Sequence, residues 1–197
     1  MGIKTTRHLD KLREVLLHPN ASGPDPAYIV YDVSGKDKWV NQTVISPGKY
    51  NGEFTKTYGH YHTEGAPNEI YTLVSGSGIG ILQKKYIDQS GTWIPKMVEE
   101  VIFIRLVNPG ETVSISNKYA HSLINTGKEK LITKDNWSTK HMPEDYKYIK
   151  NLRGFAYYLV EKDGKVEFVP NDNYKNLPEP KWLTTKEFEK LQAKNSR

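Results

Sequence analysis

Short runs of β-branched and aromatic residues, each bounded by turn residues, fill the chain between residues 27 and 170. Examples are AYIVYDV (27–33), NEIYTLVSG (68–76), GIGILQKKYI (78–87) and VEEVIFIRLV (98–107). Turn signals such as SPGKYNG, EGAPN and NPGE separate these runs. About ten short strands at this spacing predict an all-β sandwich or barrel and argue against alternating β–α units.

We expect helix only at the two ends of the chain. Leu9, Leu12, Val15 and Leu16 share one face at near-helical spacing, which predicts a helix over about residues 6–17. Near the C-terminus, Thr184 or Thr185 is placed to cap a short helix. GFAYYLVE and KVEFVP flank KDG and predict a last β-hairpin. The expected organisation is a single domain over 1–197, with a core over about 28–170 and a C-terminal extension over 171–197.

Composition restricts the classes of protein to which the chain can belong. The 197 residues include no cysteine, which excludes a disulfide scaffold, a thiolate metal site and a thiol nucleophile. No apolar run reaches the roughly 20 residues of a membrane span, and the N-terminus carries acids unlike a secretory signal, so we expect a cytoplasmic protein. The net charge is +5, but the lysines are scattered and no nucleic-acid-binding motif is present. The charge suits a solvated surface or attraction of a small anion, and no nucleic-acid or membrane partner is expected.

Two histidines and a glutamate suggest a metal site in the middle of the chain. His60 and His62 lie two residues apart, so on a strand both side chains point to one face. Glu69 begins the next β run, and a hairpin across the TEGAPN turn would bring its carboxylate beside the imidazoles. His121, at the start of a later strand, supplies a fourth candidate ligand. A lone histidine on a strand is usually a surface or core residue, but three imidazoles with a carboxylate suit a divalent transition ion, namely Fe²⁺, Mn²⁺, Ni²⁺, Co²⁺ or Zn²⁺.

The spacing of these residues resembles the two motifs of the cupin superfamily. The first cupin motif is His-x-His, a spaced glutamate and a later glycine, here Gly76. The second motif ends in His-x-x-x-Asn, matched by His121 and Asn125. This chain has Ser116 and Lys118 where that motif normally carries proline and glycine, so its second motif is degenerate.

Within the superfamily, TVISPGKYNGEFTKTYGHYH (43–62) followed by Glu69-x-Tyr71 resembles the cupin-type glucose-6-phosphate isomerases known from archaea and some bacteria. The resemblance implies a jelly-roll fold and the interconversion of glucose 6-phosphate and fructose 6-phosphate in glycolysis and gluconeogenesis. It further implies one divalent ion per subunit, with Fe²⁺ preferred, and a homodimer.

The resemblance also implies roles for individual residues. It assigns the metal to His60, His62, Glu69 and His121, the phosphate to Thr43, Thr57 and Gly59, and the sugar pocket to Tyr71 and Tyr146. Glu69 is also the candidate base. Glu144 stands where the family carries histidine, and His141, three residues earlier, is a candidate substitute. Tyr28 and Tyr31 are further candidates for the phosphate end, with core packing as the alternative, whereas Lys56 is expected to face solvent.

Other functions stay open at this point. A metal-dependent cupin oxygenase can use the same three-histidine, one-glutamate set, and a non-catalytic sugar-binding cupin would keep the pocket without turnover. For an isomerase, proton transfer through an enediol and a metal-assisted hydride shift are both compatible with these residues.

Overall fold

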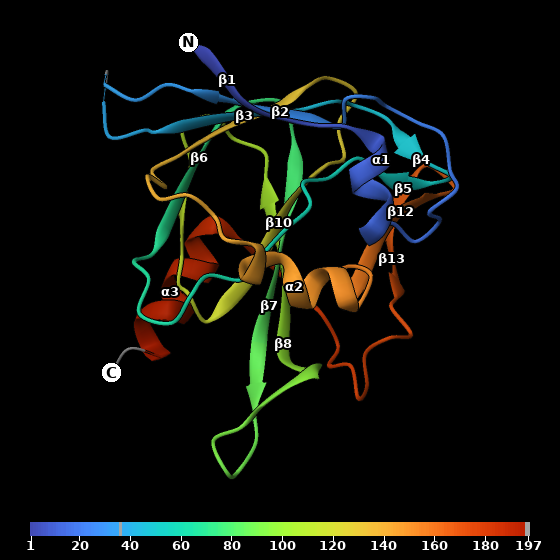
Figure 1. Ribbon diagram of the computed structural model, residues 1–197, viewed down its shortest axis with the longest axis vertical. Coiled ribbons are helices and arrows are strands. Elements are labelled where there is room, and N and C mark those ends of the chain that lie inside the picture. Colours follow the sequence, from blue (N-terminus) through green and yellow to red (C-terminus); the bar gives the residue numbers. More distant parts are fainter. Residues whose placement is uncertain (36, 196–197) are drawn as a thin grey trace.

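The computed structural model describes residues 1–35 and 37–195 and is built mainly from strands (Figure 1). Its strands are β1 (Gly2–Arg7), β2 (Tyr28–Asp32), β3 (Asn41–Ile45), β4 (Lys49–Tyr50), β5 (Glu53–Phe54), β6 (Glu69–Ser75), β7 (Gly78–Ile87), β8 (Trp93–Leu106), β9 (Thr112–Ile115), β10 (Tyr119–Asn125), β11 (Leu131–Asp135), β12 (Tyr157–Lys162), β13 (Lys165–Pro170) and β14 (Lys181–Thr184). They form a six-stranded sheet of order β1-β2-β3-β11-β6-β9 and two four-stranded sheets of order β10-β7-β8-β14 and β13-β12-β5-β4. The all-β prediction is confirmed.

The six-stranded sheet and the β10-β7-β8-β14 sheet enclose the core. Ile45 and Leu131 of the first sheet and Phe103 and Ile124 of the second are all buried in one hydrophobic cluster. The Asn125 side chain links the two layers, because its amide donates to the Ile45 carbonyl at 3.0 Å. The result is the sandwich expected of a cupin.

The predicted final hairpin is confirmed, and its turn explains why the chain reverses there. β12 and β13 are joined by two residues, Asp163 and Gly164, with φ angles of 50° and 73°. Positive φ at both central positions is the geometry of the tight turn that matches the twist of paired strands, and aspartate followed by glycine is a preferred sequence for it.

The N-terminal helix predicted over 6–17 is wrong in its first part. Gly2–Arg7 instead form β1, which pairs antiparallel with β2 at the edge of the large sheet. Helix begins only at α1 (Leu9–Leu12) and ends in a 3₁₀ turn (Arg13–Val15). The predicted apolar face is correct, since Leu9, Leu12, Val15 and Leu16 are all buried.

A second helix inside the chain was not predicted. α2 (Pro143–Asn151) has proline in its first turn, where no amide hydrogen is needed, and the Met142 amide donates to Asp145 Oδ2 at 2.9 Å. It crosses the middle of the molecule in Figure 1. The C-terminal helix α3 (Thr185–Asn195) is capped by Thr184, whose hydroxyl accepts from the Glu187 amide at 3.3 Å while Glu187 Oε2 accepts from the Thr184 amide at 2.7 Å. Within the described residues, no helix is long and apolar enough to cross a bilayer.

Candidate metal centre

The histidine-bearing segment runs beside β10, outside any regular strand of its own. His60 and His121 exchange backbone hydrogen bonds of 3.3 and 3.1 Å, and the Thr57 amide donates to the Leu123 carbonyl at 2.8 Å. Glu69 begins β6 in the other layer. The expected hairpin between the histidines and Glu69 is therefore wrong, because the carboxylate reaches the imidazoles from the opposite sheet.

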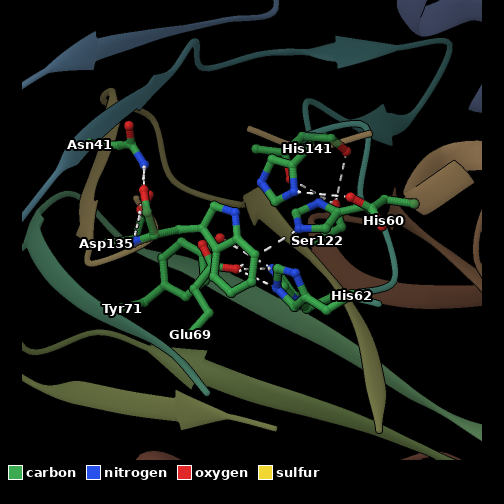
Figure 2. A network of polar contacts seen from close by, with 12 residues as sticks. Asn41, His60, His62, Glu69, Tyr71, Ser122, Asp135 and His141 are labelled. Carbon is green, nitrogen blue, oxygen red and sulfur yellow. Dashed lines mark hydrogen bonds and ion pairs between the residues drawn. The ribbon is translucent and has the colours of Figure 1, made fainter. Parts of the chain in front are cut away.

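The four predicted ligands nevertheless converge. Three of them, His60, His62 and Glu69, are labelled in Figure 2. Glu69 Oε2 lies 2.8 Å from His62 Nε2, 3.0 Å from His121 Nε2 and 3.8 Å from His60 Nε2. One ligand atom from each residue lies within 4.8 Å of the others, and all four residues are buried. This cluster is the predicted set of metal ligands brought together in space.

The contacts of the cluster fit an ion. Bonds of roughly 2.0–2.2 Å place neighbouring ligand atoms about 3 Å apart, which is the range of the two shorter contacts. His60 Nε2 is buried and has no hydrogen-bond partner among the described residues, so an acceptor of its lone pair is missing. Imidazole nitrogens with one carboxylate suit several divalent transition ions, and this donor set does not distinguish them.

The protonation states also favour metal binding. Burial, together with His121 and His141, holds the pKa of His60 well below its ordinary value, so its ring is neutral and free to donate a lone pair. Burial alone would raise the pKa of Glu69, but His121 and the other histidines outweigh it and hold that pKa well below the ordinary value. A neutral imidazole at His60 and an ionised carboxylate at Glu69 are ligand forms that a cation requires.

Two glycines allow this close packing. Gly59 has a φ of +77°, and a Cβ there would lie 2.2 Å from Phe155 Cε2 and 3.0 Å from the His121 carbonyl. Gly76, the glycine of the first motif, has a φ of +82°, and a Cβ there would lie 2.4 Å from the Lys130 carbonyl. Each glycine permits an approach of backbones that a side chain would prevent.

Asn125, the last residue of the second motif, has a structural role. Its amide donates to the carbonyls of Ile45 and Glu129 at 3.0 and 2.9 Å, and its Oδ1 accepts from the Gly127 amide at 3.0 Å. The side chain therefore holds the turn after β10 against β3 and takes no part in the ligand cluster.

A cavity of about 450 Å³ opens over the ligand cluster and contains most of the predicted site residues. Its lining includes the predicted residues Tyr28, Thr43, Thr57, Gly59, Tyr71, His141 and Tyr146. The Tyr71 hydroxyl lies 3.2 Å from His121 Nε2, and burial with the nearby Glu69 raises the pKa of Tyr71 well above its ordinary value. A protonated phenol therefore lies beside the ligand cluster.

Apart from the ligand His62, two predicted residues do not line this cavity. Tyr31 lies on β2, where Tyr28 and Val30 face the cavity, so the alternation of strand side chains turns Tyr31 to the other face. Glu144 is exposed on α2, whose buried residues are Asp145 and Ile149. The structure does not bring either residue to the site.

His141 occupies the position that Glu144 does not reach. Its ring is stacked with Trp137, at 5.6 Å between centroids and 3° between planes. The ring centroid of His60 lies 3.9 Å away. Among the two candidates for the missing family histidine, the structure places only His141 beside the ligand cluster.

Several lining residues were missed from the sequence, namely Lys4, Thr5, Arg7, Asn41, Asp135, Trp137 and Lys140. Asp135 Oδ1 accepts from Asn41 Nδ2 at 2.6 Å and from the Trp137 amide at 3.0 Å. Burial and the nearby Glu69 raise the pKa of Asp135 to about 7. Once β3, β11 and β6 are placed side by side, Asn41, Asp135 and Tyr71 fall in one row across the sheet, but their order in the sheet could not be read from the sequence.

Comparison with known proteins gives a consistent result. The family model for glucose-6-phosphate isomerase (GPI) matches residues 20–176. The glucose-6-phosphate isomerase of Thermococcus kodakarensis is 31% identical over 181 residues, covering 87% of this chain and 88% of the relative. That of Pyrococcus furiosus is 30% identical over 156 residues, covering 77% and 75%. A solved sugar phosphate isomerase of the cupin superfamily from Silicibacter pomeroyi is a distant likeness, with a TM-score of 0.33 and 12% identity over 77% of this chain and 81% of its own. The chain belongs to the glucose-6-phosphate isomerase family.

Proposed function

We propose that this isomerase interconverts glucose 6-phosphate and fructose 6-phosphate in a metal-dependent reaction at the cavity over His60, His62, Glu69 and His121. The observation that carries the proposal is the convergence of these four buried side chains on a cavity that Thr43, Thr57 and Gly59 also line. A cavity of about 450 Å³ falls within the range of small-molecule sites in proteins.

The four ligands would hold one divalent ion, with Fe²⁺ as the preferred candidate and Mn²⁺, Ni²⁺, Co²⁺ or Zn²⁺ as alternatives. Such an ion supplies Lewis-acid polarisation to the oxygens on C1 and C2 of the sugar. The preference for Fe²⁺ rests on the resemblance to the family, since the donor set accepts each of these ions.

Glu69 is the proposed base. Its three contacts with histidine nitrogens all fall on Oε2, so Oε1 is not used by the histidines, and Glu69 lines the cavity. A carboxylate in this position can take the proton from one carbon and return it to the other. If hydrogen instead moves as hydride between the carbons, Glu69 acts on the hydroxyl protons and as a ligand only.

The remaining predicted residues would bind and orient the sugar. Burial raises the pKa of both Tyr71 and Tyr146, so their hydroxyls stay protonated and can donate to sugar oxygens. His141 is the proposed third polar group at this end, held in place by Trp137. Thr43, Thr57 and the Gly59 amide are the proposed donors to the phosphate, where remote binding energy would orient the reacting carbons.

A coupled assay of fructose 6-phosphate conversion tests the proposal. We expect isomerisation that a chelator abolishes and that a single added divalent ion restores. If the metal-loaded protein shows no turnover in this assay, a non-catalytic sugar-binding cupin is supported instead. Oxygen consumption with a diketone or flavonol substrate would indicate the oxygenase alternative.

We also propose that the protein is a cytoplasmic homodimer of a single 1–197 domain. The six-stranded sheet ends at β1, an edge strand on which Ile3 is 64% exposed, and such edges are commonly covered by a partner. Light scattering coupled to size-exclusion chromatography measures the mass in solution, and a monomer would contradict the dimer.

A further inference from the structure

Arg7 places a cation inside the cavity. It ends β1 and lies opposite Tyr28 in the register of β1 and β2. Its Nε donates to the Tyr28 hydroxyl at 3.2 Å, and its guanidinium carbon lies 5.2 Å from the centroid of the Tyr58 ring. The guanidinium is thus held by one aromatic hydroxyl and one aromatic face.

The contacts of Arg7 lead directly to the proposed phosphate donors. Tyr58 lies between Thr57 and Gly59 in the chain, and the Tyr58 amide donates to the same Tyr28 hydroxyl at 3.4 Å. Arg7, Thr57 and Gly59 all line the cavity. Arg7 therefore belongs to the same end of the cavity as the residues expected to bind the phosphate.

The positive charge of Arg7 is not neutralised by the protein. Within residues 1–35 and 37–195, no carboxylate forms an ion pair with it, and no protein acceptor contacts its two Nη atoms. A half-buried guanidinium without a counter-ion is costly, and its planar set of donors matches the oxygens of a phosphoryl group. The free Nη groups can bind an anion without breaking a contact within the protein.

The chain fixes Arg7 at this position through its N-terminal segment. The Tyr58 hydroxyl donates to Glu14 Oε2 at 2.7 Å, and Lys56 Nζ donates to the Val15 carbonyl at 2.7 Å. Lys56 is also buried in an ion pair of 2.5 Å with Glu53, so the expectation that it faces solvent is wrong. These contacts anchor the residues that follow β1 to the segment that carries Thr57 and Gly59.

The other two cations of the cavity lining have different positions. Lys4 Nζ donates to Asn41 Oδ1 at 2.7 Å, and Asn41 in turn donates to Asp135. Lys4 therefore lies on the Asp135 side of the cavity. Lys140 is exposed in the loop before α2. Of the three, Arg7 alone shares its contacts with the Thr57–Gly59 segment among the described residues.

We propose that Arg7 binds the phosphoryl group of the sugar phosphate, as a specificity residue supplied by the N-terminal strand. The proposal rests on the proposed function for the nature of the substrate. Arg7 lies before residue 20, where the family match begins, so this contact lies outside the matched region. Its effect should be on KM for phosphorylated compounds, because a contact to the phosphate is made equally in the substrate complex and in the transition state.

The test compares Arg7→Gln, Arg7→Lys and Arg105→Gln with the wild-type protein. Arg105 is an exposed arginine of β8 that packs over Trp182 outside the cavity, so its substitution removes the same unit charge elsewhere. We expect Arg7→Gln to raise KM for fructose 6-phosphate about ten- to a hundredfold with kcat within about threefold, as for loss of a charge-assisted hydrogen bond. Arg7→Lys should recover part of this loss because it keeps the charge, and Arg105→Gln should match the wild type. An unchanged KM in Arg7→Gln, or an equal loss in Arg105→Gln, would overturn the proposal.

A second measurement on the wild-type protein avoids any folding defect in the variants. Labelling of arginines by phenylglyoxal, mapped by mass spectrometry, should slow at Arg7 when inorganic phosphate or fructose 6-phosphate is added, while labelling at Arg105 does not change. Equal rates at Arg7 with and without phosphate would contradict the proposal. The same measurement distinguishes failure of the Arg7 proposal from failure of the proposed function. If inorganic phosphate protects Arg7 but the protein has no isomerase activity, the anion site is supported and the proposed reaction is refuted.

Discussion

His60 and His121 exchange two backbone hydrogen bonds, of 3.3 and 3.1 Å, although they belong to different motifs of the sequence. This pairing fixes the position of His121 through main-chain contacts. It explains why the second motif can carry Ser116 and Lys118 in place of the usual proline and glycine and still deliver its histidine to the cluster.

Substitution of His121 by alanine should therefore remove metal without disturbing the strand pairing that places it. We expect His121→Ala to lose at least about a hundredfold in metal affinity, because one ligand of four is deleted and Glu69 loses its 3.0 Å partner. Metal content after dialysis, measured by mass spectrometry, and the shift of Tm on adding a chelator both report this loss. His18→Ala, at an exposed histidine, is the control. Metal content in His121→Ala equal to that of the control would remove His121 from the ligand set.

Replacing Glu69 by glutamine tests the proposed base. The amide keeps the shape of the side chain but cannot accept a proton from carbon, so we expect kcat to fall about a thousandfold. Circular dichroism should show an unchanged fold. Glu64→Gln, at an exposed residue of the preceding turn, should leave kcat unchanged. Near-normal turnover in Glu69→Gln would exclude Glu69 as the base, and deuterium from solvent in the product would favour the enediol route over the hydride shift.

The proposed phosphate donors can be tested with a pair of matched threonines. Thr43 and Thr133 are neighbours in the register of β3 and β11, but only Thr43 lines the cavity. The Thr133 hydroxyl is buried and has no partner among the described residues. We expect Thr43→Val to raise KM for fructose 6-phosphate by about five- to tenfold, as for loss of one hydrogen bond. Thr133→Val should leave KM unchanged and the free energy of unfolding equal or higher, because it removes an unsatisfied hydroxyl. Equal KM values for the two variants would exclude Thr43 from phosphate binding.

The features predicted correctly from sequence are those carried by local patterns. Alternation and turn residues predicted most strands, and the Asp163–Gly164 turn marks its hairpin unambiguously. The ligand spacing in the first motif likewise predicted the cluster. It did so for a partly incorrect reason, since His62 and Glu69 meet across two sheets and not across a hairpin.

The features missed depend on which segments become neighbours. β1 is a strand because it pairs with β2 at the sheet edge. The helical spacing of the apolar residues from Leu9 to Leu16 suggested a helix that also included the last residues of β1. Arg7 reaches the cavity only as a consequence of that pairing. The same dependence on neighbours separates Tyr28 from Tyr31 and His141 from Glu144, whose residue types alone gave no basis for a choice.

Asp135 predicts a specific pH dependence of stability. Burial and the neighbouring Glu69 raise its pKa from the ordinary value of 3.8 to about 7. Between these two pH values the folded protein holds a proton on Asp135 that the unfolded chain has released, so this residue makes the free energy of unfolding fall as pH rises from about 4 to about 7. This loss in the free energy of unfolding is complete above pH 7, where the buried Asp135 carboxylate is ionised in the folded protein as well.

Asparagine at this position removes the titration and keeps an oxygen to accept from the Asn41 amide and the Trp137 amide. In the presence of chelator, we therefore expect Asp135→Asn to be more stable than the wild type at pH 8 and equal to it near pH 4, by urea unfolding. Asp32→Asn should show the opposite sign. Hydrogen bonds from Ser34 lower the pKa of exposed Asp32, so Asp32 adds stability above the unfolded pKa that is lost as pH falls through the folded pKa. A stability difference between Asp135→Asn and wild type that stays constant from pH 4 to pH 8 would contradict the raised pKa. It would show that the hydrogen bond from Asn41 and the charge of Lys4 stabilise the ionised carboxylate enough to offset its burial.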